Sequence, residues 1–157
     1  MHVIKPPESP AKAWVHAGNI VFLAGSIEMG KADNWQDQLI YGVSHLTEGT
    51  ILNPRRDDWD PTWKQEITNP QFVEQVNWEL EGLEVADIIA FYFQPDTMSP
   101  ISLLELGLVA KSTYKDILVC CPEGFWRKGN VDIICKKYGI PTVKSLNSLI
   151  KAVGAAL

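Results

Sequence analysis

The sequence DIIAFYFQPDTMSPISLLELGLVAK, residues 87–111, is the part of this chain that most clearly indicates its fold class. Its first seven residues are almost all apolar, which is typical of a strand buried on both faces of a parallel sheet. From Pro100 to Lys111 the chain is again mainly apolar and predicts a helix, with the proline suited to its first turn. A buried strand followed by a helix is the repeating unit of a parallel α/β sheet.

Predicted strands and helices alternate on both sides of this segment. The other strands are predicted at residues 19–25, 50–53, 116–121 and 140–143, and the other helices at 33–47, 70–85, 130–138 and from 145 onward. We therefore predict one α/β domain over residues 1–157, a doubly wound Rossmann-like or flavodoxin-like fold with a mainly parallel five-stranded sheet.

The composition is that of a globular protein, with 46% hydrophobic and 21% charged residues. A net charge of −5 argues against binding to nucleic acid, which requires a basic surface. No run approaches the length of about 18 apolar residues that a membrane helix needs, and the N-terminal residues lack a hydrophobic signal core. We expect a soluble cytoplasmic protein with no membrane association.

Neither cysteines nor histidines suggest a metal site. The three cysteines, two of them adjacent at Cys120 and Cys121, form no CxxC pair, and the three histidines lack ligand spacing. The Gly25-Ser26 turn lacks the other glycines of GxGxxG, and the chain contains no GxxxxGK[ST] motif. We predict no metal and no cofactor.

The fold predicts where a ligand would bind. Ligands of open parallel sheets bind beyond the carboxyl ends of the strands, which here are marked by Gly25, Asn53, Gln94 and Pro122. Arg55 and Arg56 follow the second of these ends, beside Asp57 and Asp58. They could contact an anionic group of a ligand or form surface ion pairs, and the sequence does not separate the two.

Glu105 is the most informative single residue. In the predicted helix it shares a face with Ile101 and Val109, four residues away on either side. A carboxyl group on an apolar face must be paired, protonated or open to a cleft. Because the helix starts at the predicted ligand edge, with Ser99 as its expected cap, we interpret Glu105 as a functional carboxylate.

Glu79 is a second candidate, on the flank of the apolar stripe of the 70–85 helix. Glu74, Glu81 and Glu84 show that the same helix also carries acids suited to solvent. The composition alone does not distinguish a functional Glu79 from an exposed one.

Several motifs together resemble one family: VFLAGSI, NPRR, NWELEGLEVADIIAFYF, PDTMSPISLLELG and PEGFWRKGNV. They are similar to the nucleoside 2-deoxyribosyltransferase superfamily, in particular to its small bacterial and phage deoxyribosyltransferase-like proteins. The resemblance extends over about residues 19–135. It implies that Glu105, in the ELG triplet, is the nucleophile. It also implies that Glu79 is the proton donor, where most characterised members carry Asp.

The resemblance also implies the substrate contacts. Ser99 stands where deoxyribosyltransferases have a base-contacting Asp and where related deoxynucleoside-monophosphate N-hydrolases have a serine that helps to bind the 5′-phosphate. Asn130 resembles the residue that family members insert into the site of a neighbouring subunit, which implies a homo-oligomer. Ile27 and Met29 could exclude a 2-hydroxyl group by size. The predicted substrate-binding residues are Gly25, Ser26, Ile27, Asn53, Arg55, Arg56, Ser99 and Asn130.

Three functions follow from this sequence. The first is a transferase that exchanges nucleobases between 2′-deoxynucleosides through a covalent intermediate on glutamate. The second is an N-hydrolase of deoxynucleosides or their 5′-monophosphates. The third is a non-catalytic nucleotide-binding module. In each case the expected ligands are a small nucleoside or nucleotide and a nucleobase.

Overall fold

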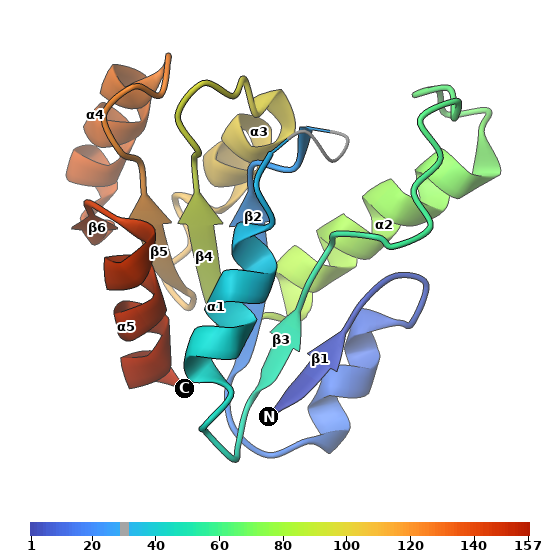
Figure 1. The fold of residues 1–157 in the computed structure, drawn as a ribbon, viewed down its shortest axis with the longest axis horizontal. Helices are drawn as coiled ribbons and strands as arrows, with labels where there is room; N and C mark the ends of the chain where they lie inside the picture. The colour runs from blue at the N-terminus through green and yellow to red at the C-terminus, as the bar shows by residue number, and fades with distance from the viewer. Residues whose placement is uncertain (29–31) are drawn as a thin grey trace.

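The computed structural model describes residues 1–28 and 32–157. Figure 1 shows a twisted sheet with helices packed on both of its faces. In chain order the elements are β1 (His2–Ile4), the 3-10 helix η1 (Pro10–Val15), β2 (Ile20–Gly25), α1 (Trp35–Val43), β3 (Thr50–Leu52), α2 (Pro70–Val85), β4 (Ile88–Tyr92), α3 (Pro100–Val109), β5 (Asp116–Cys120), α4 (Lys128–Tyr138), β6 (Thr142–Val143) and α5 (Leu146–Ala156).

The sheet is parallel throughout, with strand order β1-β3-β2-β4-β5-β6. This confirms the predicted doubly wound fold, but the described residues form six strands and not five. The additional strand is β1, which pairs with β3 at the sheet edge. Because it has only three residues and precedes a Pro-rich stretch, it carries no periodic signal in the sequence.

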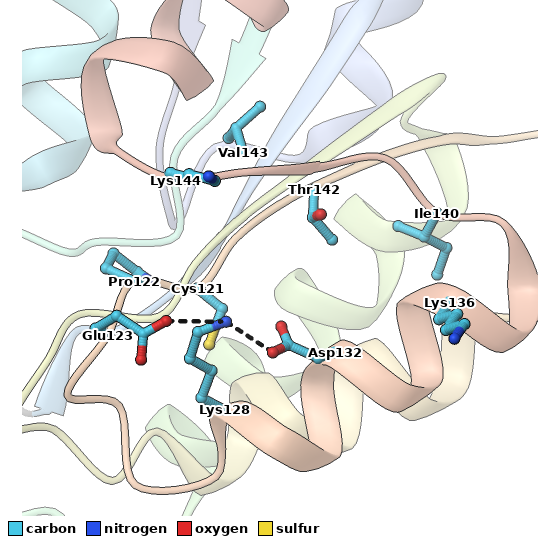
Figure 2. A pocket seen from close by; sticks show the side chains of 10 residues that line it. All are labelled: Cys121, Pro122, Glu123, Lys128, Asp132, Lys136, Ile140, Thr142, Val143 and Lys144. Atoms are coloured by element: carbon cyan, nitrogen blue, oxygen red, sulfur yellow. Dashed lines mark hydrogen bonds and ion pairs between the residues drawn. The ribbon is translucent and has the colours of Figure 1, made fainter.

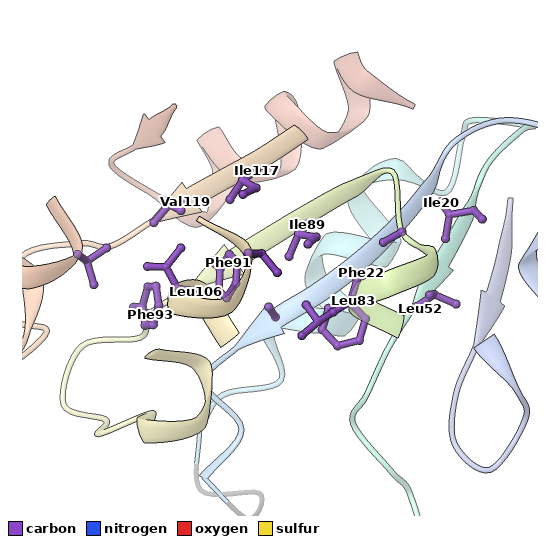
Figure 3. Close-up of a cluster of buried hydrophobic side chains, with 14 of the residues drawn as sticks. Ile20, Phe22, Leu52, Leu83, Ile89, Phe91, Phe93, Leu106, Ile117 and Val119 are labelled. Carbon is purple, nitrogen blue, oxygen red and sulfur yellow. The ribbon is translucent and has the colours of Figure 1, made fainter. Parts of the chain in front are cut away.

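The strand residues divide between two hydrophobic clusters because successive side chains point to opposite faces. On one face Val21 and Leu23 pack with α1 and α5. On the other face Phe22 and Ala24 pack with residues of η1, α2, α3 and α4. Figure 3 shows this second cluster, in which Leu106 of α3 lies among strand residues such as Phe91. Burial on both faces explains why the strands read as continuous apolar runs.

Helices α2 and α3 begin at Pro70 and Pro100, the prolines that the sequence predicted for their first turns. The Asn69 side chain accepts hydrogen bonds from the backbone N–H groups of Gln71 and Phe72, and Pro70 occupies the first helical position of α2. Helix α1 is shorter than the predicted 33–47, because Asn34 caps it and it ends at Val43.

The chain order of the strands predicts a ligand crevice between β2 and β4. Strand β3 pairs with one edge of β2, and the chain then returns so that β4 pairs with the other edge of β2. Ligands of open parallel sheets bind at such a reversal, so the expected crevice lies at the carboxyl ends of the two strands, beside Gly25 and Gln94. Within residues 1–28 and 32–157, no helix is long and apolar enough to cross a membrane.

Candidate active site

Glu105 is a buried carboxyl group on α3, with 7% of the residue exposed. Burial raises its pKa to about 8, and the negative charge of Glu79 contributes to the increase. Among the residues that the structure describes, none donates a hydrogen bond to the Glu105 carboxyl group or forms an ion pair with it. Within residues 1–28 and 32–157, the alternative of a paired structural carboxylate therefore lacks a partner.

The neighbours of Glu105 differ from those expected. Ile101 and Leu104 are exposed, at 58% and 60%, whereas Ser102 and Leu106 are buried with Glu105. The prediction that Ile101 shares its buried face was wrong. Helix α3 is apolar almost all round, so its sequence has no polar side that would show which residues face solvent.

Glu79 lies on α2, on the same face of the sheet as α3, and is partly buried. Its Oε1 atom accepts a hydrogen bond of 2.8 Å from Gln75 Nε2, which also donates to the Pro54 carbonyl at 2.9 Å. Burial raises the pKa of Glu79 to about 7, although the Gln75 hydrogen bond lowers it. Glu79 thus differs from Glu74, which forms an ion pair with Arg56 at the surface.

The two carboxyl groups act on each other electrostatically, and both pKa values are raised into the neutral range. Two carboxyl groups that interact in this way titrate as a pair, and together they bind about one proton near neutral pH. Such a pair can supply one carboxylate and one carboxylic acid at the same time. Nucleophilic catalysis and general acid catalysis at a glycosidic bond require that combination.

Three buried hydroxyl groups form a cluster at the crevice between β2 and β4. Ser26 Oγ lies 2.8 Å from Thr97 Oγ1 and 2.6 Å from Ser99 Oγ, and the last two atoms are 3.0 Å apart. The Gln94 backbone N–H donates to Ser26 Oγ, and Thr97 Oγ1 donates to the Gln94 carbonyl. The structure thus brings together Ser26 and Ser99, both predicted, with Thr97, which was not.

Ser99 is not the side-chain cap that the sequence predicted for α3. Its φ of 44° and ψ of 50° lie in the left-handed region, and its side chain makes no capping hydrogen bond. A capping serine normally adopts an extended backbone conformation. Here the Ser99 hydroxyl belongs to the buried cluster with Ser26 and Thr97 instead.

Gly25 and Ile27 flank Ser26 at the end of β2. Gly25 has φ of 146°, and a Cβ atom there would lie 2.3 Å from the Tyr92 carbonyl oxygen of β4, so no side chain fits. Ile27 is partly buried, and its carbonyl accepts a hydrogen bond from the Ala32 N–H. Met29 lies outside the described residues.

The three predicted residues after β3 are engaged with the protein itself. The buried Asn53 accepts a hydrogen bond from the Arg55 N–H. The Arg55 guanidinium donates to the carbonyls of Ala32 and Asp33, both at 3.2 Å. Arg56 forms ion pairs with Asp58 and Glu74 and packs over Trp63. Arg56 therefore belongs to an ion-pair network, and Arg55 fixes the backbone at Ala32 and Asp33.

Asn130 is exposed on α4 and is not brought together with Glu79, because α4 and α2 lie at opposite ends of the sheet (Figure 1).

A cavity of about 550 Å³ beside α4 contains neither Glu79 nor Glu105 (Figure 2). There Lys128 lies between Glu123 and Asp132, at 3.8 and 2.7 Å. Within the described part of the chain, no group of three or more His, Cys, Asp or Glu side chains could hold a metal ion.

Comparison with known proteins identifies the family. Residues 18–125 match the family model described as nucleoside 2-deoxyribosyltransferase like. The chain is also similar to the crystal structure of a conserved protein from Enterococcus faecalis V583, with a TM-score of 0.63, 11% identity, and coverage of 90% of this chain and 100% of the other. That likeness concerns the fold alone, and no curated protein sequence matches the chain. Because the family match spans more than half of its residues, the chain belongs to the nucleoside 2-deoxyribosyltransferase-like family.

Proposed function

We propose that this protein cleaves the N-glycosidic bond of 2′-deoxynucleosides and transfers the deoxyribosyl group to another nucleobase through an ester on Glu105. The family supports a glycosyl-transfer role with nucleosides and nucleobases as ligands. The observation that carries the finer proposal is the state of Glu105. It is buried, it has no hydrogen-bond partner among the described residues, and it interacts with the charge of a second carboxyl group, Glu79.

The chemistry suits an ionised carboxylate. Cleavage of an N-glycosidic bond builds positive charge at the anomeric carbon, C1′. A Glu105 oxygen forms a bond to C1′ as the bond between C1′ and the base nitrogen breaks, and the electron pair of that bond leaves with the base. Because a buried carboxylate is poorly solvated, the developing positive charge stabilises it strongly.

Glu79 supplies the proton that the departing base needs. The pair holds about one proton near neutral pH, and the positive charge at C1′ favours the arrangement in which Glu105 is ionised and Glu79 carries that proton. Glu79 then protonates the base as it departs and is left as a carboxylate. Gln75 stabilises this carboxylate through its hydrogen bond to Glu79 Oε1.

The second half of the reaction reverses these steps. A nitrogen of the incoming base attacks C1′ and loses its proton to Glu79, and the ester bond to Glu105 breaks. If water is the acceptor instead, the same residues hydrolyse the deoxynucleoside. The transferase and hydrolase alternatives therefore differ in the acceptor and not in the role of either glutamate.

One experiment separates the candidate functions. The protein is incubated with thymidine and adenine, with and without a 5′-phosphate on the donor, and the products are separated by chromatography. Formation of deoxyadenosine and thymine supports the transferase, and formation of free deoxyribose supports the hydrolase. Ligand binding without either product supports a binding module and contradicts our proposal.

We further propose that the protein works as a homo-oligomer. Ile101, Leu104 and Leu108 form one exposed apolar face of α3, the helix that carries Glu105, and a second copy of the chain would cover it. Asn130 is the candidate contact to the site of that copy, although it lies beyond the family match, which ends at residue 125.

We also propose that residues 1–157 form one domain and that the protein is cytoplasmic, where its three free cysteines stay reduced.

A further inference from the structure

Glu28 makes a contact to which the mechanism gives no role. It follows β2 at the crevice, and its Oε1 atom accepts hydrogen bonds from the backbone N–H groups of Met98 and Ser99, at 2.6 and 2.7 Å. Both Glu28 and Ser99 have positive φ values, 48° and 44°. Non-glycine residues adopt this conformation only at an energetic cost, and such strain is concentrated at functional sites.

The contact lies at the same end of the site as the buried hydroxyl cluster. The Ser99 N–H binds Glu28, and the Ser99 hydroxyl binds Ser26 and Thr97. Glu105 follows Ser99 by six positions, which corresponds to roughly 9 Å along the helix axis. A sugar bonded to Glu105 and extended along α3 therefore brings its far end towards Glu28.

Glu28 occupies the donors that an anion would use. Consecutive backbone N–H groups at the start of a helix are good partners for a phosphate. Here neither N–H group can donate to a ligand until the Glu28 carboxylate is displaced, which breaks two short charge-assisted hydrogen bonds. A phosphate that stayed beside Glu28 would instead be repelled by its charge.

The two arginines that the sequence made candidates for phosphate binding do not relieve this repulsion. Arg56 is paired with Asp58 and Glu74, and Arg55 is bonded to backbone carbonyls. Glu79 and Glu105 add further acidic groups to the site. The side chains that the structure describes around this end therefore favour an uncharged group over a phosphate.

We propose that Glu28 is a specificity-determining residue that excludes phosphorylated substrates, so that the protein acts on 2′-deoxynucleosides and not on their 5′-monophosphates. This inference rests on the proposed function, because it concerns the substrate of the same site. It assigns to Ser26, Thr97 and Ser99 the contact with an uncharged hydroxyl group of the sugar.

The test compares the wild-type protein with the variants Glu28→Gln and Glu28→Ala. For each, kcat/KM is measured with the fastest 2′-deoxynucleoside donor and with its 5′-monophosphate. Glu28→Gln keeps an oxygen acceptor for both N–H groups and removes the charge, whereas Glu28→Ala also frees the donors. We expect the ratio of kcat/KM for monophosphate over nucleoside to rise by about tenfold or more in both variants. Glu48→Gln, an exposed change before β3 at the opposite edge of the sheet, should leave the ratio unchanged.

Two results would overturn the inference: a wild-type protein that prefers the monophosphate, or an unchanged ratio in both Glu28 variants. If the wild-type protein turns over neither substrate, the proposed function fails by itself. The Glu28 inference is then judged from the Kd values of the nucleoside and the monophosphate, measured by calorimetry. A Kd ratio that Glu28→Gln leaves unchanged contradicts it, and a ratio shifted towards the monophosphate supports it.

Discussion

Gln75 Nε2 donates a hydrogen bond of 2.8 Å to Glu79 Oε1, which connects a buried neutral side chain to one of the two carboxyl groups of the site. The same nitrogen donates to the Pro54 carbonyl, so the amide group has a fixed orientation. This hydrogen bond stabilises the charged form of Glu79 and lowers its pKa, against the larger effect of burial. In the proposed mechanism Gln75 is therefore a positioning residue that acts through Glu79.

Replacing Gln75 with Leu should move the pH dependence of the reaction. Without the donor, the pKa of Glu79 rises further above its present value of about 7, because burial is no longer opposed. The alkaline limb of the kcat profile, where the pair loses its last proton, should shift to higher pH. The value of kcat should fall, because a weaker acid protonates the departing base less readily.

The matched control is Gln71→Leu, an exposed position in the first turn of the same helix. It should leave both the pH profile and kcat unchanged. A purely structural role for Gln75 would lower activity equally at all pH values. That result, with no shift of the alkaline limb, would contradict the assignment.

Gly25→Ala should destabilise the protein. The new Cβ would lie 2.3 Å from the Tyr92 carbonyl oxygen, and the backbone has φ of 146°, a value that alanine rarely adopts. We expect a loss of roughly 2 kcal/mol or more in the free energy of unfolding. Gly129→Ala is the control, because nothing lies within 4 Å of its added Cβ and it is helical. It should be neutral or stabilise by up to about 1 kcal/mol.

Leu104→Glu tests the proposed oligomer. Leu104 lies in the middle of the exposed apolar face of α3, so a charge there should prevent a second copy from packing against it. Analytical ultracentrifugation should show a shift to monomer together with a loss of activity. Ile67→Glu, at an exposed position in the loop before α2, should change neither property. A wild-type protein that is fully active as a monomer would refute the proposal.

The sequence predicted most of the fold because long elements carry strong signals. The apolar runs of β2, β4 and β5 and the capped, amphipathic α2 follow directly from burial on two faces and on one. For helix α3, in contrast, the sequence was not sufficient to predict which side faces the sheet. Its sequence predicted a helix but not its orientation, because only the packed structure shows that Leu106 faces the sheet while Leu104 does not.

The site was predicted in part for similar reasons. Glu105 was identified because a carboxylate in an apolar helix is chemically unusual. The contributions of Gln75, Thr97 and Glu28 depend on which segments of the folded chain lie next to one another. No local sequence pattern predicts these contacts. Thr97 lies in the loop that the sequence predicts at the end of β4, close to the expected ligand edge, whereas Glu28 carries no signal of its own.

The raised pKa of Glu105 also predicts how stability depends on pH. Its pKa is about 8 in the folded protein and near 4.5 when unfolded, so the folded state binds more protons between these values. The free energy of unfolding should therefore fall as pH rises from about 4.5 to about 8. Glu105→Gln has no such group, so its stability relative to the wild type should increase across this range. Urea denaturation at several pH values measures this difference. A difference that stays constant with pH would contradict a raised pKa.

Glu105→Gln should also abolish base exchange and hydrolysis while it preserves the fold and the binding of a nucleoside. The amide has the size of the carboxyl group but cannot form an ester with C1′, so the covalent intermediate cannot form. Glu79→Gln should be less severe, since water can still protonate some departing bases, and it should alter the pH profile. Trapping with a slow substrate, followed by peptide mass mapping, should locate the deoxyribosyl group on Glu105. A sugar adduct on another residue, or near-native turnover by Glu105→Gln, would show that Glu105 is not the nucleophile and that its burial needs a structural explanation.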